Sequence, residues 1–330
     1  MNKLYYCGKP ADGYGWGVAN TNLVRELRKL CDVEFPDPGR RRFDAPVFIP
    51  IADSSLTPLQ PVKSAPKRIG YCFTEWPLTP QAHTNASQYD LIFTGSTWNT
   101  MKLRANGIKH ADTLIQGVDF ERFKPQPPST RKGFVIFSGG KYEFRKGQDY
   151  VISAVKVFMR HHADAVLLAS WFNPWPESEK SMEKSWLIDS KKPLDGLPQD
   201  RVIKLPALKN EQMPELYGMA HVGIFPNRCE AGTNMVMTEF MACARPVIAT
   251  FAHGHYDVLN GDGPFHLTNG SIDPAGWFNC NVSDIIAHLE TAYEQRVTLH
   301  ERGEMCRKLV ENLTWEACAR KIYAAAFDQV

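Results

Sequence analysis

Three basic residues stand close together in the segment FSGGKYEFRKGQD (137–149), directly after a predicted strand. They are Lys141, Arg145 and Lys146, and Gly140 before them allows a tight turn. Cations at this spacing repel one another, and a bound diphosphate would relieve that repulsion. The segment therefore predicts an anion site. The alternative is a solvated basic loop in front of a helix.

A second set of chemically capable residues lies in PNRCEAGTNMVMTEFMACARPVIAT (226–250). A strand is expected to end at Pro226, and a helix to begin after Gly232. The start of a helix presents free N–H groups and partial positive charge, which suit a diphosphate. Gly232 lets a ligand approach the backbone closely, and Thr233 or Asn234 can cap the helix.

Two carboxylates flank this helix start. Glu230 lies in the loop and Glu239 lies in the helix. Because carboxylates accept hydrogen bonds from vicinal hydroxyls, Glu230 is expected to hold hydroxyls of a sugar. Glu239 is expected to hold ribose hydroxyls if its face of the helix is turned toward the ligand. The alternatives are that Glu230 only faces the helix dipole and that Glu239 is a surface residue.

These segments resemble the glycosyl transferases group 1, also called family 4, which have the α/β GT-B fold of two Rossmann-like domains. The family signature has seven residues between two glutamates, then a helix of small residues and a Pro-Val-Ile strand. Here eight residues separate Glu230 from Glu239, and the run EFMACARPVIAT keeps the pattern. The family binds its donor's phosphates with an Arg and a Lys five residues apart. Lys141 and Lys146 have this spacing, and Arg145 can compensate for the lysine at 141.

The resemblance implies a retaining enzyme that moves a hexosyl or pentosyl unit from a nucleotide sugar to an acceptor hydroxyl. Its catalytic residues would be Glu230, Lys146 and Lys141, and its donor a UDP-sugar or, alternatively, a GDP-sugar. The two lysines and the helix start at Gly232 would stabilise charge on the leaving diphosphate without a metal. The leaving phosphate would help to deprotonate the acceptor, so no cofactor is required. The sequence contains no Asp-x-Asp motif, which agrees with this scheme.

A glycine-rich segment, GYGWG (13–17), follows the first predicted strand. Glycine loops at this place often cradle phosphates, and in the family such a loop approaches the donor and the acceptor. Gly15 and Gly17 are therefore expected near the donor. Trp16 either stacks on a sugar or packs against the sheet.

Four further polar residues are weaker candidates. Glu75 and His83 follow the fourth predicted strand and either assist the acceptor hydroxyl as a base or are ion-paired or surface side chains. His253 and His255 form an H-x-H pair after a later strand, but a metal site there lacks an identifiable third ligand. Loop polarity or acceptor contact is the favoured interpretation of this pair.

The first part of the chain is the more basic one. Residues 1–125 contain 16 basic and 12 acidic residues, whereas the whole chain has a net charge of +2. The run Arg40-Arg41-Arg42 makes Arg41 an acceptor-side candidate for an anionic partner. A solvated basic loop is the alternative. Besides a saccharide or glycan intermediate, a hydroxylated base of modified viral DNA is thus a candidate acceptor. A non-catalytic sugar-binding protein is a further alternative.

Strands and helices must alternate to position these residues, which indicates α/β domains with parallel sheets. Residues 1–125 are expected to form an acceptor-binding Rossmann-like domain and residues 126–315 a nucleotide-sugar-binding one. Residues 316–330 are expected to form a helix that packs back on the first domain. Ligands of parallel sheets bind beyond the carboxyl ends of the strands, so the site is expected in a cleft between the two domains.

Length and composition fit two ordinary globular domains: 330 residues, of which 43% are hydrophobic and 22% charged. No apolar run reaches the length of a membrane helix, and the N-terminus turns polar too soon for a signal peptide. The eight cysteines form no C-x-x-C pair, so a reduced, cytoplasmic protein is expected. The G-x-G-x-x-G fingerprint is absent, which counts against a dinucleotide-dependent oxidoreductase.

Overall fold

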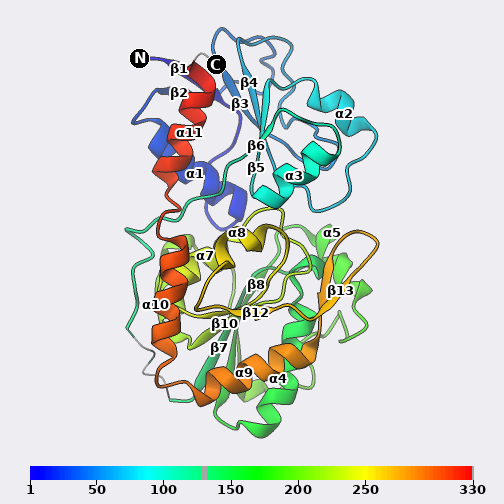
Figure 1. The fold of residues 1–330 in the computed structure, drawn as a ribbon, viewed down its shortest axis with the longest axis vertical. Helices are drawn as coiled ribbons and strands as arrows, with labels where there is room; N and C mark the ends of the chain where they lie inside the picture. The colour runs from blue at the N-terminus through cyan, green and yellow to red at the C-terminus, as the bar shows by residue number, and fades with distance from the viewer. Residues whose placement is uncertain (128, 130–131, 329–330) are drawn as a thin grey trace. The chain divides into compact units, whose positions relative to one another are not determined.

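The computed structural model describes residues 1–127, 129 and 132–328. None of the helices within these ranges is long and apolar enough to cross a membrane. The chain divides into two compact units (Figure 1). The first consists of Met1–Asp119, Ala231–Thr233 and Leu313–Val330, and the second of Phe120–Glu230 and Asn234–Asn312.

The first unit is built on a six-stranded sheet with the order β2-β1-β3-β4-β5-β6, in which all neighbouring strands pair in parallel. Its strands are β1 (Lys3–Tyr6), β2 (Asp32–Glu34), β3 (Val47–Pro50), β4 (Arg68–Cys72), β5 (Leu91–Thr94) and β6 (Ala111–Thr113). Its helices are α1 (Gly15–Leu27), α2 (Gln81–Ala86), α3 (Thr97–Ala105) and α11 (Trp315–Phe327).

The last helix of the chain, α11, packs beside α1 in the first unit (Figure 1). The helix begins after Thr314, whose side chain accepts a hydrogen bond from the Ala317 N–H, as N-cap residues do. Lys321 Nζ lies 2.7 Å from Asp112 Oδ2 on β6. The end of the chain is thereby attached to the first sheet.

The second unit contains a six-stranded parallel sheet with the order β12-β11-β10-β7-β8-β9. Counted from β7, this is the strand order of dinucleotide-binding Rossmann sheets, and the order reverses between β7 and β10. Its strands are β7 (Phe134–Lys141), β8 (Ala165–Phe172), β9 (Val202–Lys204), β10 (Val222–Phe225), β11 (Val247–Thr250) and β12 (Phe265–Leu267). The predicted α/β fold with two Rossmann-like parallel sheets is confirmed.

Helices cover this sheet, and α4 and α9 lie side by side (Figure 1). The helices are α4 (Gln148–His161), α5 (Pro176–Glu179), α6 (Met213–Met219), α7 (Met235–Ala242), α8 (Tyr256–Leu259), α9 (Val282–Glu294) and α10 (Leu299–Val310). A separate hairpin is formed by β13 (Gly270–Ile272) and β14 (Phe278–Cys280). Short 3₁₀ turns are η1 (Phe144–Lys146), η2 (Lys180–Lys184), η3 (Gln199–Arg201), η4 (Asn210–Gln212) and η5 (His253–His255).

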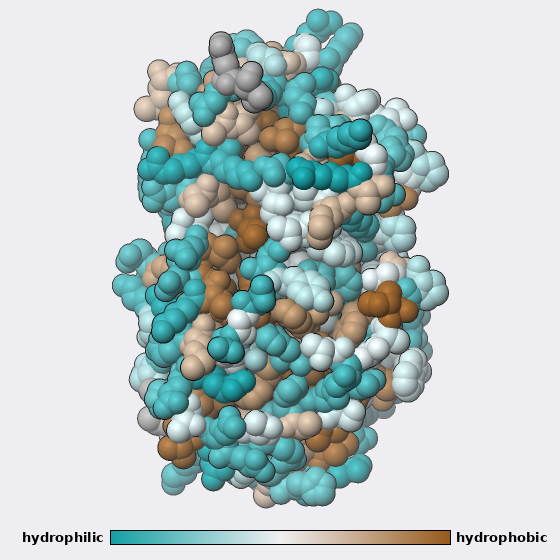
Figure 2. Space-filling model, in the orientation of Figure 1, coloured by the Kyte–Doolittle hydropathy of each residue, from teal (hydrophilic) through white to brown (hydrophobic). Residues whose placement is uncertain are grey.

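The central strands are mostly apolar because both faces of each sheet are covered. Every residue of β3, β10 and β11 is buried. On the face drawn in Figure 2, hydrophilic side chains predominate, and hydrophobic ones form small separate patches. The apolar residues of the strands thus form the cores, and the polar residues that matter chemically lie in the loops at the strand ends.

The predicted glycine loop at 13–17 is wrong in part, because Gly15 to Gly17 form the first turn of α1. Tyr14 has an extended backbone and precedes the helix. A Cβ on Gly17 would lie 2.7 Å from the Ala11 Cβ, so the close approach of the preceding loop requires a glycine there. Gly17 therefore serves local packing.

One fully buried ion pair lies inside the second unit. Arg228, in the loop after β10, is 1% exposed, and Asp149, in the first turn of α4, is 0% exposed. The guanidinium donates to both carboxylate oxygens, with Nη1–Oδ1 at 2.8 Å and Nη2–Oδ2 at 2.6 Å. It also lies over the rings of Phe144 and Tyr150, 3.6 Å and 4.0 Å from their centroids. This pair joins the start of α4 to the loop after β10.

The substitution Asp149→Asn is expected to destabilise the protein by about 3–5 kcal/mol, because it leaves the Arg228 charge buried without a counter-ion. Urea unfolding at pH 7 measures the change. The control is Glu177→Gln, which removes an exposed ion pair with Lys180 and should change stability by less than about 1 kcal/mol. Equal effects of the two substitutions would show that the buried pair does not hold the unit together.

Candidate functional site

The candidate site lies where two loops leave the same edge of the second sheet. β7 and β10 are paired in parallel, so the residues that follow them emerge side by side. The strand order reverses between these two strands, and open parallel sheets bind ligands in the crevice at such a reversal. Lys141 ends β7, and Glu230 lies in the loop after β10.

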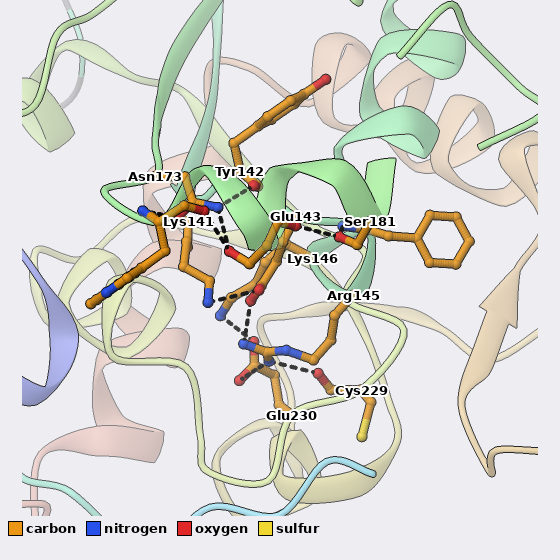
Figure 3. Close-up of polar contacts among 12 residues, drawn as sticks. Lys141, Tyr142, Glu143, Arg145, Lys146, Asn173, Ser181, Cys229 and Glu230 are labelled. Atoms are coloured by element: carbon orange, nitrogen blue, oxygen red, sulfur yellow. Dashed lines mark hydrogen bonds and ion pairs between the residues drawn. The ribbon is translucent and has the colours of Figure 1, made fainter. Parts of the chain in front are cut away.

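Three cations and two carboxylates alternate at this edge (Figure 3). Lys141 Nζ lies 2.8 Å from Glu143 Oε2, and Arg145 Nη2 lies 2.6 Å from Glu143 Oε1. Arg145 Nη1 lies 3.1 Å from Glu230 Oε2, and Lys146 Nζ is hydrogen-bonded to Glu230 Oε1. The predicted cluster of cations is therefore present, but it is held together by carboxylates and retains one net positive charge.

Glu230 is buried and is held by several donors. Asn227 Nδ2 donates to the same oxygen as Lys146, and the Gly254 N–H donates to the Glu230 carbonyl at 3.0 Å. Burial by itself would raise the pKa of the Glu230 carboxyl, but Lys146 and Arg145 lower it to about 2. Glu230 is therefore an anion at neutral pH, and its carboxylate has partners beyond the helix dipole.

Glu143 was not singled out from the sequence, although it belongs to this cluster. It is 7% exposed and has an extended backbone in front of η1, and its side chain does not cap that turn. Burial opposes ionisation, but Arg145 and Lys141 lower the pKa of its carboxyl below the ordinary value. Its sequence signal was its place as the one acid between the basic residues 141 and 146.

The loop that carries the cations is fixed by its neighbours. Arg228 Nη1 donates to the Phe144 carbonyl at 2.6 Å, and the Arg228 N–H donates to the Arg145 carbonyl at 2.8 Å. Gly147 has φ +71°, and a Cβ there would lie 2.3 Å from the Pro226 carbonyl oxygen. Only a glycine fits where the two loops meet.

The tight turn predicted at Gly140 is wrong, because β7 continues through this residue to Lys141. β7 pairs with β8 over all eight of its residues, which extends the strand. Gly140 nevertheless has φ +119°, and no atom lies within 4 Å of the place where a Cβ would stand. The strand thus ends in an open position beside Lys141, whose Nζ lies 5.3 Å from the Trp175 ring centroid.

The start of α7 offers unpartnered polar groups. Asn234 precedes the helix with φ 61°, and its Nδ2 is buried without a hydrogen-bond partner in the described structure. The Thr233 Oγ1 is also buried, and it too has no hydrogen-bond partner in the described structure. Buried polar atoms are nearly always hydrogen-bonded, so these groups indicate a ligand at the helix start. Gly232 is packed in the first unit, where a Cβ would lie 2.8 Å from the Phe73 ring.

Glu239 lies in α7 and is 5% exposed, so it is not a surface residue. Asn210 Nδ2 donates to its Oε1 at 2.9 Å, and the Tyr217 hydroxyl donates to its Oε2 at 3.4 Å. A carboxylate has about four lone-pair positions. Both oxygens of Glu239 already use some of these positions for protein donors.

His255 presents a neutral imidazole near Glu230. Its Nδ1 lies 2.9 Å from the Thr250 carbonyl, so Nδ1 carries the proton, and its buried Nε2 has no partner in the described structure. Burial lowers the pKa of His255 to about 4, against the opposing effect of Glu230. Among residues 1–127, 129 and 132–328, no three His, Cys, Asp or Glu side chains are grouped to hold a metal ion.

The acceptor-side candidates lie in the first unit. The Trp16 ring packs edge-on against Phe73 and Tyr71, with ring centroids 5.0 Å and 5.7 Å apart. Of the two roles expected for Trp16, these contacts agree with packing against the sheet. Gly15 begins α1, and no atom lies within 4 Å of its Cβ position. Glu75 is partly buried after β4, and His83 is exposed on α2.

The basic run of the first unit is largely engaged within that unit. Arg40 lies 3.4 Å from Glu34 and 3.3 Å from Asp44, and its guanidinium stacks 4.4 Å from the Tyr5 ring centroid. Arg41 is exposed and donates to the Pro38 carbonyl at 2.7 Å. These contacts do not single out a nucleic-acid surface.

The protein is expected to lose stability as the pH falls from 7 to 5, because His255 stays neutral when folded. Its folded pKa of about 4 lies below the ordinary histidine value of 6.5, so in this range mainly the unfolded chain binds the proton. The substitution His255→Gln should reduce the stability difference between pH 7 and pH 5 by about 2 kcal/mol. Urea unfolding at both pH values measures it, and an unchanged difference would contradict the assignment.

Comparisons with known proteins bear on this site and on the fold. Residues 132–280 match the family model described as Glycosyl transferases group 1. The curated proteins gave no match. HepE from Anabaena, solved in complex with UDP-glucose, is similar with a TM-score of 0.70 and 12% identity, over 98% of this chain and 98% of that one.

Two further solved structures have the same architecture. Sucrose-phosphate synthase from Thermosynechococcus elongatus matches with a TM-score of 0.66 and 15% identity, over 98% of this chain and all of that one. A TarM variant from S. aureus, in complex with ligands that include UDP, matches with a TM-score of 0.62 and 12% identity, over 82% of this chain and 52% of that one. The chain therefore has the GT-B fold, and its segment 132–280 belongs to the glycosyl transferases group 1.

Proposed function

We propose that this protein transfers a glycosyl unit from a nucleoside-diphosphate sugar to an acceptor hydroxyl. The observation that carries the proposal is the convergence of Lys141, Arg145 and Lys146 at the reversal of strand order, in the unit that holds the unpartnered start of α7. The family match over residues 132–280 supports it. HepE, which shares the fold, was solved with UDP-glucose, and a UDP-sugar is accordingly the first donor to test.

The donor's diphosphate is assigned to the cations after β7 and to the start of α7. Lysine and arginine supply charge-assisted hydrogen bonds, and free N–H groups at a helix start suit phosphate oxygens. The Thr233 hydroxyl and the Asn234 amide are additional donors, which explains why these buried groups have no partner in the described structure. Glu239 is assigned to the ribose hydroxyls because the segment that carries it matches the family model.

In the proposed reaction, the bond between the anomeric carbon and the diphosphate oxygen breaks, and negative charge develops on that oxygen. Once the donor is bound, Lys146 and Lys141 are in place to stabilise this charge, so the protein need not reorganise during the bond-breaking step. The acceptor oxygen forms its bond on the same face, which retains the anomeric configuration. Its proton passes to the leaving diphosphate.

The electrostatics assign an orienting role to Glu230. Because its pKa is held at about 2, the carboxyl is ionised at neutral pH and cannot act as a general acid. It fixes Lys146 and can accept hydrogen bonds from hydroxyls of the transferred sugar. The neutral His255 Nε2, which lacks a partner in the described structure, is a second acceptor for such a hydroxyl.

The first unit is proposed to hold the acceptor, for which a saccharide or glycan intermediate is the class put forward. The alternative of a modified DNA base depended on the basic run at residues 40–42. Because Arg40 is paired with Glu34 and Asp44, no specific observation favours nucleic acid over a sugar.

A thermal-shift panel of UDP, GDP, ADP and TDP tests the donor site. One nucleoside diphosphate should stabilise the protein, by about 2.7 kcal/mol at 100 times its dissociation constant. The corresponding nucleoside should give a much smaller shift, because the phosphates supply most of the binding energy. Lys146→Met should remove most of the shift, whereas the exposed Lys180→Met should not. If none of the four nucleoside diphosphates raises the melting temperature of the wild type, the proposed function is wrong.

The role of Glu239 is tested by comparing UDP with 2′-deoxy-UDP. If Glu239 holds the ribose hydroxyls, the wild type should bind UDP more tightly by about 1.5–3 kcal/mol, the value of a hydrogen bond to a charged group. Glu239→Gln should reduce this preference. Calorimetric titration measures both affinities, and their ratio is insensitive to a general loss of stability. A preference that survives the substitution would assign the ribose to another residue.

A further inference from the structure

We propose that Glu143 is a resident counter-ion of the phosphate site, and that a nucleoside diphosphate binds by taking its place between Lys141 and Arg145. The inference rests on the proposed function, because it concerns the same donor site. It assigns a role to an acid that lies within the basic segment and that the transfer chemistry itself does not use.

The geometry places the Glu143 carboxylate where two phosphate oxygens are expected. Its Oε2 lies 2.8 Å from Lys141 Nζ, and its Oε1 lies 2.6 Å from Arg145 Nη2 (Figure 3). These are the distances of charge-assisted hydrogen bonds to an anion. A diphosphate that binds between these two cations would therefore take the place of the carboxylate.

Glu143 and Glu230 differ in how they are held. Glu230 is bonded to Lys146 and Arg145 and also to the neutral Asn227, and its own backbone carbonyl accepts from Gly254. Its carboxylate thus belongs to a network that includes a neutral side chain. The ion pairs of Glu143 are made with two of the cations that the diphosphate itself would engage. Glu143 is therefore the carboxylate that exchanges, and Glu230 is the one that stays.

The surroundings allow the Glu143 side chain to leave. Lys141 is 31% exposed along its side chain, and the space beside Gly140 is open. The backbone of Glu143 is held independently of its carboxylate, since its carbonyl accepts from the Lys146 N–H at 2.9 Å. Rotation of the side chain toward solvent therefore leaves η1 intact.

The need to displace the Glu143 carboxylate determines which anions the site binds. Without Glu143, the cluster would keep only Glu230 as a counter-ion and would attract small anions of the solvent more strongly. With Glu143 in place, a ligand must supply enough negative charge to replace two ion pairs. A diphosphate does so, whereas a monovalent anion does not. After the reaction, return of the carboxylate favours release of the nucleoside diphosphate.

Calorimetric titration of UDP and of uridine into the wild type and Glu143→Gln tests the proposal. The glutamine keeps the shape of the side chain but lacks the charge that competes with the phosphates. UDP should bind about tenfold more tightly to the variant, which corresponds to about 1.4 kcal/mol, and uridine binding should not change. Glu177→Gln removes the same charge from an exposed site in the same unit and should leave UDP affinity unchanged.

A second variant covers the case in which Glu143→Gln does not fold. Glu143→Asp keeps the charge but is one methylene shorter, so it cannot span both cations and should give a smaller gain in UDP affinity. If the wild type binds UDP and both variants bind it equally or more weakly, Glu143 supports the cations and the proposal is wrong. If the wild type binds no nucleoside diphosphate at all, the proposed function fails, and this proposal fails with it.

Discussion

The buried fork between Asp149 and Arg228 is the interaction on which the rest of the site depends. It joins the first turn of α4 to the loop after β10, and the same arginine also holds the backbone of η1 through the Phe144 and Arg145 carbonyls. One residue, through its side chain and its backbone N–H, thus fixes both loops that leave the sheet at its reversal of strand order. A buried charge pair is a weak source of net stability, but its loss is costly. Here the ion pair matters because it fixes the segment that carries Arg145 and Lys146.

Charge alternation is the second constraint. Three cations in one short segment are tolerable in the folded chain only because Glu143 and Glu230 separate them. The arrangement keeps the cations rigid and partly desolvated, which strengthens their attraction for a phosphate. It also means that the site is closer to neutral than its sequence indicates. Ligand binding is then a replacement of one anion by another, and the cost of exposing bare cations to water is avoided.

Much of this could be predicted from the sequence, because the relevant signals are local. The apolar runs of β7, β8 and β10 and the helical periodicity of α4 gave the fold class, and the spacing of the basic residues indicated an anion site. The glycines were less reliable as indicators of turns. Gly140 continues a strand because its partner strand is equally long, and Gly15 begins a helix, although both positions resemble turns when only nearest neighbours are considered.

Long-range pairings could not be predicted. Nothing in the sequence indicates that Asp149 meets Arg228 or that Glu239 meets Asn210, since each partner is far away along the chain. The role of Glu143 was hidden for a different reason. In a sequence, a single glutamate among basic residues is usually interpreted as a solvated surface charge. Only the burial of Glu143 and its contacts with Lys141 and Arg145 show that its carboxylate lies among the cations. The strand β12 was not predicted from the sequence.

A crystal structure of the protein with UDP bound is the most direct test of the central claim, that the loops after β7 and β10 form a diphosphate site. The claim predicts phosphate oxygens within hydrogen-bond distance of Lys141 and Lys146, and a Glu143 side chain turned away from Arg145. A UDP molecule bound elsewhere, with Glu143 still bridging Lys141 and Arg145, would contradict it.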